Sequence, residues 1–183
     1  PPHSGSAFSL IDDIYRPELA PGQEFRFQPR AGVTVTVTYS PEFPPSWKAQ
    51  REGGRFGAAL TRDPLRPDIT VELQMAGEPA VILVLDAKST DAFSPVKFRE
   101  MADYSRQVFD LHTGRQPIRQ VFLLHRDRRA RPVLNWPPYW ENRRLPADSL
   151  LLGAVPCVPA EKGQTPENLG RVLDRFLENH AVL

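Results

Sequence analysis

Two acidic residues and a lysine flank apolar runs in the middle of this 183-residue chain. Asp68 comes just before the strand-like run 69–73, and the tripeptide Asp86-Ala87-Lys88 directly follows the run 80–85. Because successive side chains of a strand alternate between its faces, we expect Asp86 and Lys88 on the same face. Charged groups at the end of a buried strand are rare outside functional sites, so this pattern favours an active site.

These residue types suit the metal-dependent hydrolysis of a phosphodiester. Mg²⁺ takes oxygen ligands, commonly one or two carboxylates together with waters and phosphate oxygens. We therefore predict that Asp68, Asp86 and the carbonyl of Ala87 bind Mg²⁺ or Mn²⁺. Lys88 would orient the attacking water or stabilise the charge of the transition state. Glu72, four positions after Asp68 on the same strand face, is a lesser candidate that could support the site.

The elements that must position these residues are typical of an α/β fold. Apolar periodicity and turn residues predict the following order: a helix over 7–16, an edge strand near 25–27, a Val–Thr strand over 33–40, strands over 69–73 and 80–85, a helix over 96–112, strands over 121–124 and 150–158, and a helix over 166–181. The segment 41–66 is predicted to be irregular. A helix that connects two buried strands favours a parallel pair inside a mixed sheet.

The predicted helix over 96–112 carries a polar face beside its apolar stripe. Glu100, Tyr104 and Gln107 follow one another at helical spacing, so they share that face. They are candidates for supporting the site or the strand being cut. For Tyr104, a plain contact between helix and sheet is an equally good interpretation.

Four arginines follow the predicted strand over 121–124: Arg126, Arg128, Arg129 and Arg131. This basic run is either a solvated loop or a surface that contacts nucleic-acid phosphates. The overall charge does not decide between the two, because 23 Lys and Arg face 22 Asp and Glu. His112 and His125 have no His or Cys partner at ligand spacing, which argues against a zinc site.

Other features limit the location of the protein. No apolar run reaches the roughly 18 residues that a membrane span needs, so no membrane partner is expected. Cys157 is the single cysteine, which excludes an internal disulfide and suits a reducing, cytoplasmic location. A chain that begins at Pro1 rather than Met is expected to be part of a longer protein or to have an engineered start.

The central motif also resembles a known superfamily. Pro67-Asp68, followed by Asp86-Ala87-Lys88 behind an aliphatic strand, resembles the signature of the PD-(D/E)XK nucleases. The segment 99–104 resembles the Gln-x-x-x-Tyr helix of RecB-like and McrC-like members, with Glu100 in place of Gln. The run 153–156 before the last helix is similar to the tail of McrC-like domains of restriction and phage-defence proteins. The resemblance covers roughly residues 31–180.

This resemblance implies a restriction-endonuclease-like core over 31–183, with a mixed central sheet flanked by helices, after an N-terminal extension over 1–30. It also implies a Mg²⁺-dependent DNA endonuclease that works with other domains or subunits of a larger restriction or defence protein. Members often carry a further acid ahead of the core, for which Asp12, Asp13, Glu24 or a residue upstream are candidates. One alternative is a weak or inactive module of the same fold that binds nucleic acid or protein. Another is a structural domain without Mg²⁺.

Overall fold

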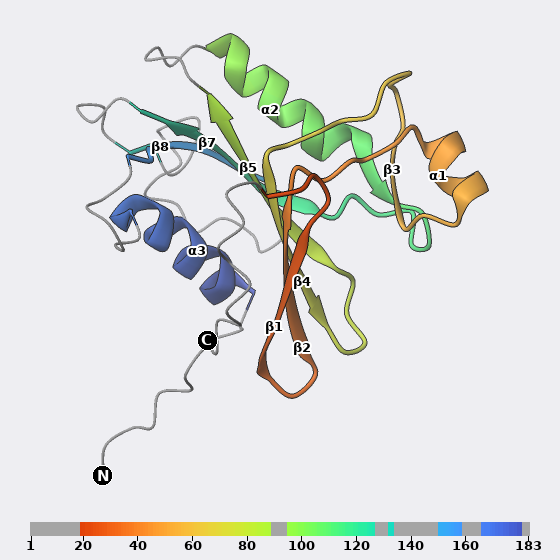
Figure 1. The fold of residues 1–183 in the computed structure, drawn as a ribbon, viewed down its shortest axis with the longest axis horizontal. Helices are drawn as coiled ribbons and strands as arrows, with labels where there is room; N and C mark the ends of the chain where they lie inside the picture. Colours follow the sequence, from red (N-terminus) through yellow and green to blue (C-terminus); the bar gives the residue numbers. More distant parts are fainter. Residues whose placement is uncertain (1–18, 89–94, 127–131, 134–149, 159–165, 181–183) are drawn as a thin grey trace.

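The chain is built around a mixed six-stranded sheet that lies between helices, as the computed structural model in Figure 1 shows. The structure describes residues 19–88, 95–126, 132–133, 150–158 and 166–180. Within them the elements are β1 (Glu24–Arg30), β2 (Val33–Tyr39), α1 (Ser46–Glu52), β3 (Phe56–Ala58), β4 (Ile69–Met75), β5 (Val81–Lys88), α2 (Pro95–Gln107), β6 (Val108–Asp110), β7 (Ile118–His125), β8 (Leu151–Pro156) and α3 (Glu167–Asn179).

The sheet has an antiparallel half and a parallel half. Its strand order is β1-β2-β4-β5-β7-β8. The pairs β1–β2, β2–β4 and β4–β5 are antiparallel. β5 pairs parallel with β7, and β7 with β8. The connection from β5 to β7 contains α2, so the predicted parallel pair around a crossover helix is confirmed.

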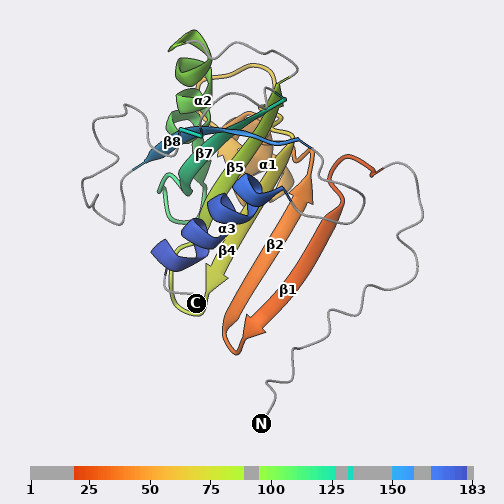
Figure 2. The ribbon, with the colours of Figure 1, turned by 90° about the vertical axis from the view of Figure 1, so that its left-hand side faces the viewer.

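Helices cover the two faces of the sheet, so each face has its own core (Figures 1 and 2). On one face, Leu83 and Leu85 of β5 pack with Phe176 of α3. On the other face, Ile82 and Val84 of β5 pack with Met101 of α2. Strands that are apolar on both faces are expected in a parallel region covered by helices on both sides. The alternation along β5 places Asp86 and Lys88 on the face covered by α2.

Several predicted boundaries are corrected by tertiary pairing. The segment 41–66 is not irregular throughout, because it contains α1 and β3. The predicted helix over 96–112 is wrong at its end. It stops at Gln107, and Val108–Asp110 instead forms β6, which pairs with β3. Val108 is fully buried in β6. Because an apolar residue can be buried in a helix or in a strand, its apolar character alone did not distinguish the two.

The start of the chain divides between described and undescribed residues. β1 pairs with β2 as the edge strand of the main sheet, so the sheet begins within the segment 1–30 that was predicted as an extension. The helix predicted over 7–16 lies outside the described residues. None of the helices in the described ranges combines the length and apolarity of a membrane span.

Candidate metal and phosphodiester site

Asp68 and Asp86 come together because of the register between β4 and β5. Ile69 pairs with Leu85, and the next pair in this register places Asp68, just before β4, opposite Asp86 of β5. Residues opposite each other in an antiparallel pair project to the same face, with Cβ atoms about 5 Å apart. Both carboxyl groups therefore lie at the same end of these two central strands, beneath α2.

The contacts of this cluster are short and specific. The backbone N–H of Ala87 donates a hydrogen bond to Asp68 Oδ2 at 2.6 Å. Lys88 Nζ lies 2.8 Å from Asp86 Oδ2. The Asp68 side chain lies close enough to Asp86 to raise the pKa of the Asp86 carboxyl group, in addition to the effect of burial. The sequence-predicted trio of Asp68, Asp86 and Lys88 is therefore assembled in one place.

The backbone around Asp68 is held from both sides. Pro67 before it is buried, and the N–H of Ser40 donates to the Asp68 carbonyl oxygen at 2.6 Å. Ser40 has a φ of 44°, a left-handed conformation that is costly for a residue other than glycine. Such backbone strain persists only where surrounding contacts impose it, and it is frequent near functional sites.

Burial and the neighbouring charged groups together determine the charge state of Asp86 and Lys88. Asp86 is 4% exposed, and this burial raises the pKa of its carboxyl group. The hydrogen bond and charge of Lys88 lower that pKa, and the adjacent Asp68 raises it. For Lys88, burial lowers the pKa, but the hydrogen bond to Asp86 and the charges of Asp86, Asp68 and Glu100 give a net rise. Lys88 is therefore a cation and not a proton acceptor.

Two of the predicted supporting residues on α2 act on the same cluster. Burial raises the pKa of the Tyr104 hydroxyl, and the charges of Asp86, Asp68 and Glu100 raise it further. Tyr104 thus keeps its proton and can donate a hydrogen bond near the carboxylates. Glu100 is exposed and adds negative charge beside Lys88.

Gln107 and Glu72 lie away from this cluster. Gln107 is the last residue of α2, about 10 Å along the helix from Glu100, and its carbonyl oxygen accepts from the N–H of Ala59. Glu72 shares the sheet face of Asp68, but four strand residues separate them by about 13 Å. Its carboxylate instead pairs with Arg55 at 2.9 Å. A single cation cannot bind both Asp68 and Glu72 at such a separation.

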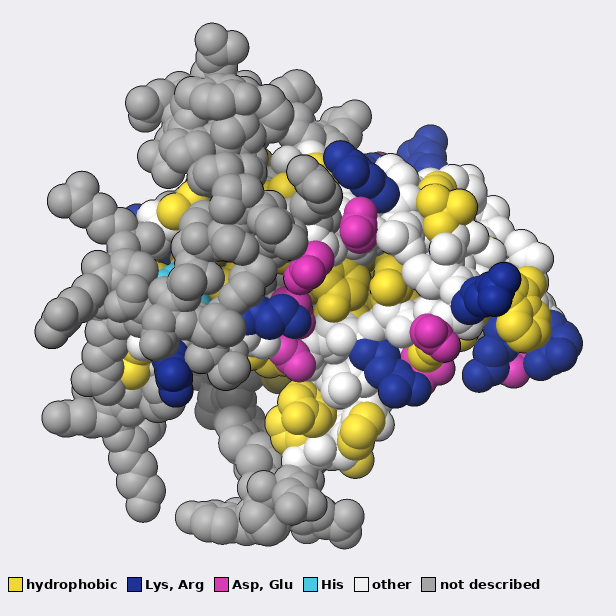
Figure 3. Space-filling view, turned by 90° about the horizontal axis from the view of Figure 1, so that it is seen from above, with side chains coloured by type: hydrophobic (Ala, Val, Ile, Leu, Met, Phe, Trp, Pro, Cys, Tyr) yellow, Lys and Arg dark blue, Asp and Glu magenta, His cyan; other side chains and the backbone are white. Residues whose placement is uncertain are grey.

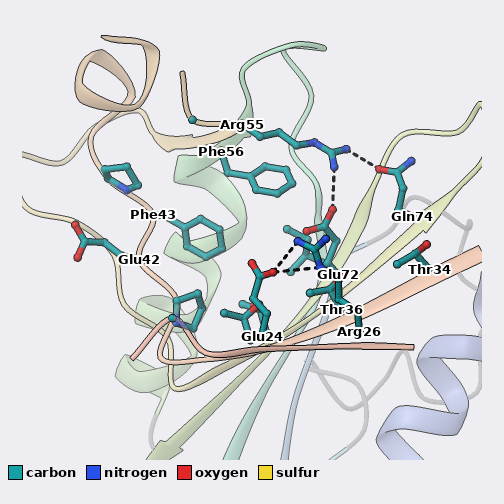
Figure 4. A pocket seen from close by; sticks show the side chains of 17 residues that line it. Glu24, Arg26, Thr34, Thr36, Glu42, Phe43, Arg55, Phe56, Glu72 and Gln74 are labelled. Carbon is teal, nitrogen blue, oxygen red and sulfur yellow. Dashed lines mark hydrogen bonds and ion pairs between the residues drawn. The ribbon is translucent and has the colours of Figure 1, made fainter. Parts of the chain in front are cut away.

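Glu72 belongs to an open groove on the same face of the sheet, which Figure 4 shows from close by. The groove has a volume of about 710 Å³, and its lining includes Thr36 and Thr70 beneath, with Arg55 and Phe56 to one side. Thr70 lies two positions from Asp68 on β4, so the groove leads toward the aspartates. Its acidic groups are neutralised locally: Glu24 binds Arg26, Glu42 binds Arg66, and Glu72 binds Arg55.

His125 lies at the site, although the sequence analysis considered it only as a possible zinc ligand. It ends β7, is 7% exposed, and pairs in register with Lys88 on the neighbouring parallel strand. The register of two parallel strands could not be read from spacing, although both strands end in polar residues. Arg126 follows it and is exposed, whereas Arg128, Arg129 and Arg131 lie outside the described residues.

The remaining acidic candidates are placed as follows. Glu24 lies on β1, three strands away from β5, a separation of about 14 Å. Asp12 and Asp13 lie outside the described residues. Within the described ranges, no group of three or more His, Cys, Asp or Glu side chains is arranged to hold a metal ion.

The donor set nevertheless fits a hard cation. Two neighbouring carboxyl groups repel each other, and a metal cation would offset this repulsion further than Lys88 does on its own. Mg²⁺ commonly uses one or two carboxylates and keeps several waters, so a third protein carboxylate is not required. Asp68, Asp86 and the carbonyl of exposed Ala87 are the oxygen donors at this edge.

Comparison with protein-family models, curated proteins and solved structures gives no significant match to this chain.

Proposed function

We propose that this chain is a Mg²⁺- or Mn²⁺-dependent nuclease domain with a restriction-endonuclease-like core, which hydrolyses phosphodiester bonds of DNA. The observation that carries the proposal is the convergence of Asp68, Asp86 and Lys88 at the ends of two paired strands. The parallel strand that follows α2, beside β5, supports the same fold assignment.

Asp68, Asp86 and the Ala87 carbonyl would hold the metal. When bound, the ion would supply Lewis-acid polarisation of the phosphate and lower the pKa of a bound water. The like charges of Asp68 and Asp86 favour cation binding, since a cation would relieve the repulsion that raises the pKa of Asp86.

Lys88 and Tyr104 would handle the substrate. Because Lys88 keeps its proton, it can donate to a nonbridging phosphate oxygen or hold the attacking water, but it cannot remove a proton from that water. Tyr104, also protonated, can donate a hydrogen bond from the α2 side. Acting together, these two donors would stabilise negative charge that develops on the phosphate.

DNA is proposed as the substrate, with other domains or subunits of a restriction or defence protein supplying much of the affinity in the cytoplasm. Seen from the edge where β5 ends, acidic and basic side chains are interspersed among the described residues (Figure 3). Such a mixed surface gives weak phosphate attraction, because affinity for a polyanion grows with the number of phosphates neutralised.

The experiment is a cleavage assay on plasmid and single-stranded DNA with Mg²⁺, Mn²⁺ or EDTA. D86N and K88M should reduce cleavage by at least about a hundredfold, the usual effect of removing an electrostatic group at the reacting centre. D63N and K48M change the same residue types away from the site and should cleave as the wild type does. Activity in EDTA, or equal cleavage by D86N and D63N, would refute the proposal.

A second candidate function is a binding module of the same fold with a weak or absent active site. The ion pair between Lys88 and Asp86, at 2.8 Å, favours it, because the lysine occupies a carboxylate oxygen that a metal would use. This candidate predicts that Mg²⁺ leaves the melting temperature unchanged. It also predicts that DNA binding, measured by fluorescence anisotropy, is the same for D86N and the wild type.

A further inference from the structure

A second pocket lies at the opposite end of the sheet from the aspartates. It has a volume of about 240 Å³ and is lined by residues from the β4–β5 turn, the β6–β7 turn, the start of β7 and the residue after α3. Val81 lines this pocket, and Lys88 ends the same strand about 23 Å away. The pocket is therefore separate from the proposed metal site.

Cationic and hydrogen-bonding groups gather in this pocket: Arg115, Arg119, His180, Thr113 and Gln116 all line it. Burial lowers the pKa of His180, and the positive charge of Arg119 lowers it further. The imidazole thus lies in the positive field of the pocket.

The acids near the pocket do not neutralise the two arginines. Asp110 accepts from Arg55 Nε at 3.1 Å and from the N–H groups of His112 and Thr113 at 2.9 and 3.1 Å, so its carboxylate is already engaged. Glu78 is exposed on the β4–β5 turn. Among the described residues, neither Arg115 nor Arg119 forms an ion pair.

We propose that this pocket binds a phosphate group, carried by a small phosphorylated molecule or by a nucleic-acid backbone. Two guanidinium groups match the planar, bidentate recognition of phosphate oxygens, and the Thr113 hydroxyl lies in the same lining. The Gln116 amide nitrogen, also in the lining, already donates to the Arg106 carbonyl oxygen at 3.0 Å. The volume equals about eight water molecules, which suits one phosphate group and is below the usual size of a site that encloses a drug-sized ligand.

The test measures binding to the metal-free chain in EDTA, so that it does not depend on the proposed nuclease activity. One arm follows the melting temperature with inorganic phosphate against chloride at equal ionic strength. The other arm follows fluorescence anisotropy of a labelled oligothymidine. The variants are R115Q, R119Q and R119K, with R62Q as an exposed arginine control and D63N as an exposed aspartate control.

We expect R115Q and R119Q to weaken binding at least about tenfold, since each removes a charge-assisted contact. R119K should retain part of the binding, because lysine keeps the charge but not the bidentate geometry. R62Q and D63N should bind as the wild type does. Loss in the phosphate arm alone identifies a small ligand, and loss in the oligonucleotide arm alone identifies a nucleic-acid backbone. No binding in either arm, or equal weakening by R62Q, would overturn the proposal.

Discussion

Replacing Asp68 with asparagine should stabilise the metal-free protein while removing its response to Mg²⁺. The two side chains are isosteric, so the amide oxygen introduced by D68N can still accept the hydrogen bond that Ala87 now donates at 2.6 Å. The new amide nitrogen can donate to the Asp86 carboxylate, where the wild type has a second carboxyl group. The substitution thus exchanges a repulsive contact for a charge-assisted hydrogen bond.

The size of the effect follows from the burial of the two partners. A hydrogen bond to a charged group contributes about 1.5–3 kcal/mol. Asp68 is partly exposed, so solvent screens part of that gain and we expect about 1–2 kcal/mol. For a chain of this size, the melting temperature should rise by about 2–8 °C.

The gain should depend on pH in a definite direction. Burial and the Asp68 charge raise the folded-state pKa of Asp86 above its usual 3.8. A raised acid pKa contributes stability at low pH that is lost as pH rises through the folded value. D68N removes one cause of the rise, so its advantage over the wild type should be larger at pH 8 than at pH 4, which is close to the usual value.

The assay is thermal unfolding at both pH values, in EDTA and with excess Mg²⁺, and D63N serves as an exposed aspartate control. At a Mg²⁺ concentration of 100 times its Kd, the wild type should gain about 2.7 kcal/mol, and D68N should gain much less. A lower melting temperature of D68N at pH 8, or an equal gain at pH 4 and pH 8, would refute the reasoning.

Three further substitutions test a close contact of β8, the ion pairs of Arg55 and the supporting role of Tyr104. A Cβ at Gly153 would lie 2.2 Å from a ring carbon of buried Phe122, so G153A should lower the free energy of unfolding by about 1–3 kcal/mol in urea titration. G170A, in open space on α3, is the matched control and should be neutral or slightly stabilising. R55M leaves two carboxylates without their guanidinium partner and should cost about 2–3 kcal/mol, measured by the same titration. Y104F should lower the cleavage rate by about two- to tenfold and leave the melting temperature unchanged. If the melting temperature falls together with the cleavage rate, Tyr104 has a packing role alone.

Strand patterns predicted the part of the fold that positions the site. The apolar runs before Asp86 and at 121–124 were predicted as buried strands, and their order around a helix left a parallel pair as the favoured arrangement, which the sheet has. The α1–β3 segment was missed because its short elements are stabilised by contacts far along the chain. β3 pairs with β6, about 50 residues later in sequence.

The site was predictable where local alternation decides it and unpredictable where register decides it. Asp86 and Lys88 share a face because they are two residues apart on one strand. Glu72 obeys the same rule, and its separation of about 13 Å from Asp68 follows from the rise per residue of a strand. The pairing of its carboxylate with Arg55, in contrast, depends on tertiary structure. His125 is level with Lys88 because of the parallel register, a relation that spacing along the chain does not encode.

The features that would make this edge of the sheet functional also make it costly for the fold. Two carboxyl groups lie side by side, Asp86 is 4% exposed, and Ser40 holds the Asp68 backbone from a left-handed conformation with a φ of 44°. A packing role would be served better by apolar residues, since replacing buried charged groups in this way is often neutral or stabilising. The cluster is instead held together by Lys88 and by the N–H of Ala87, each of which contacts the Oδ2 oxygen of one aspartate. This cost without a structural benefit is the physical reason to expect a ligand there.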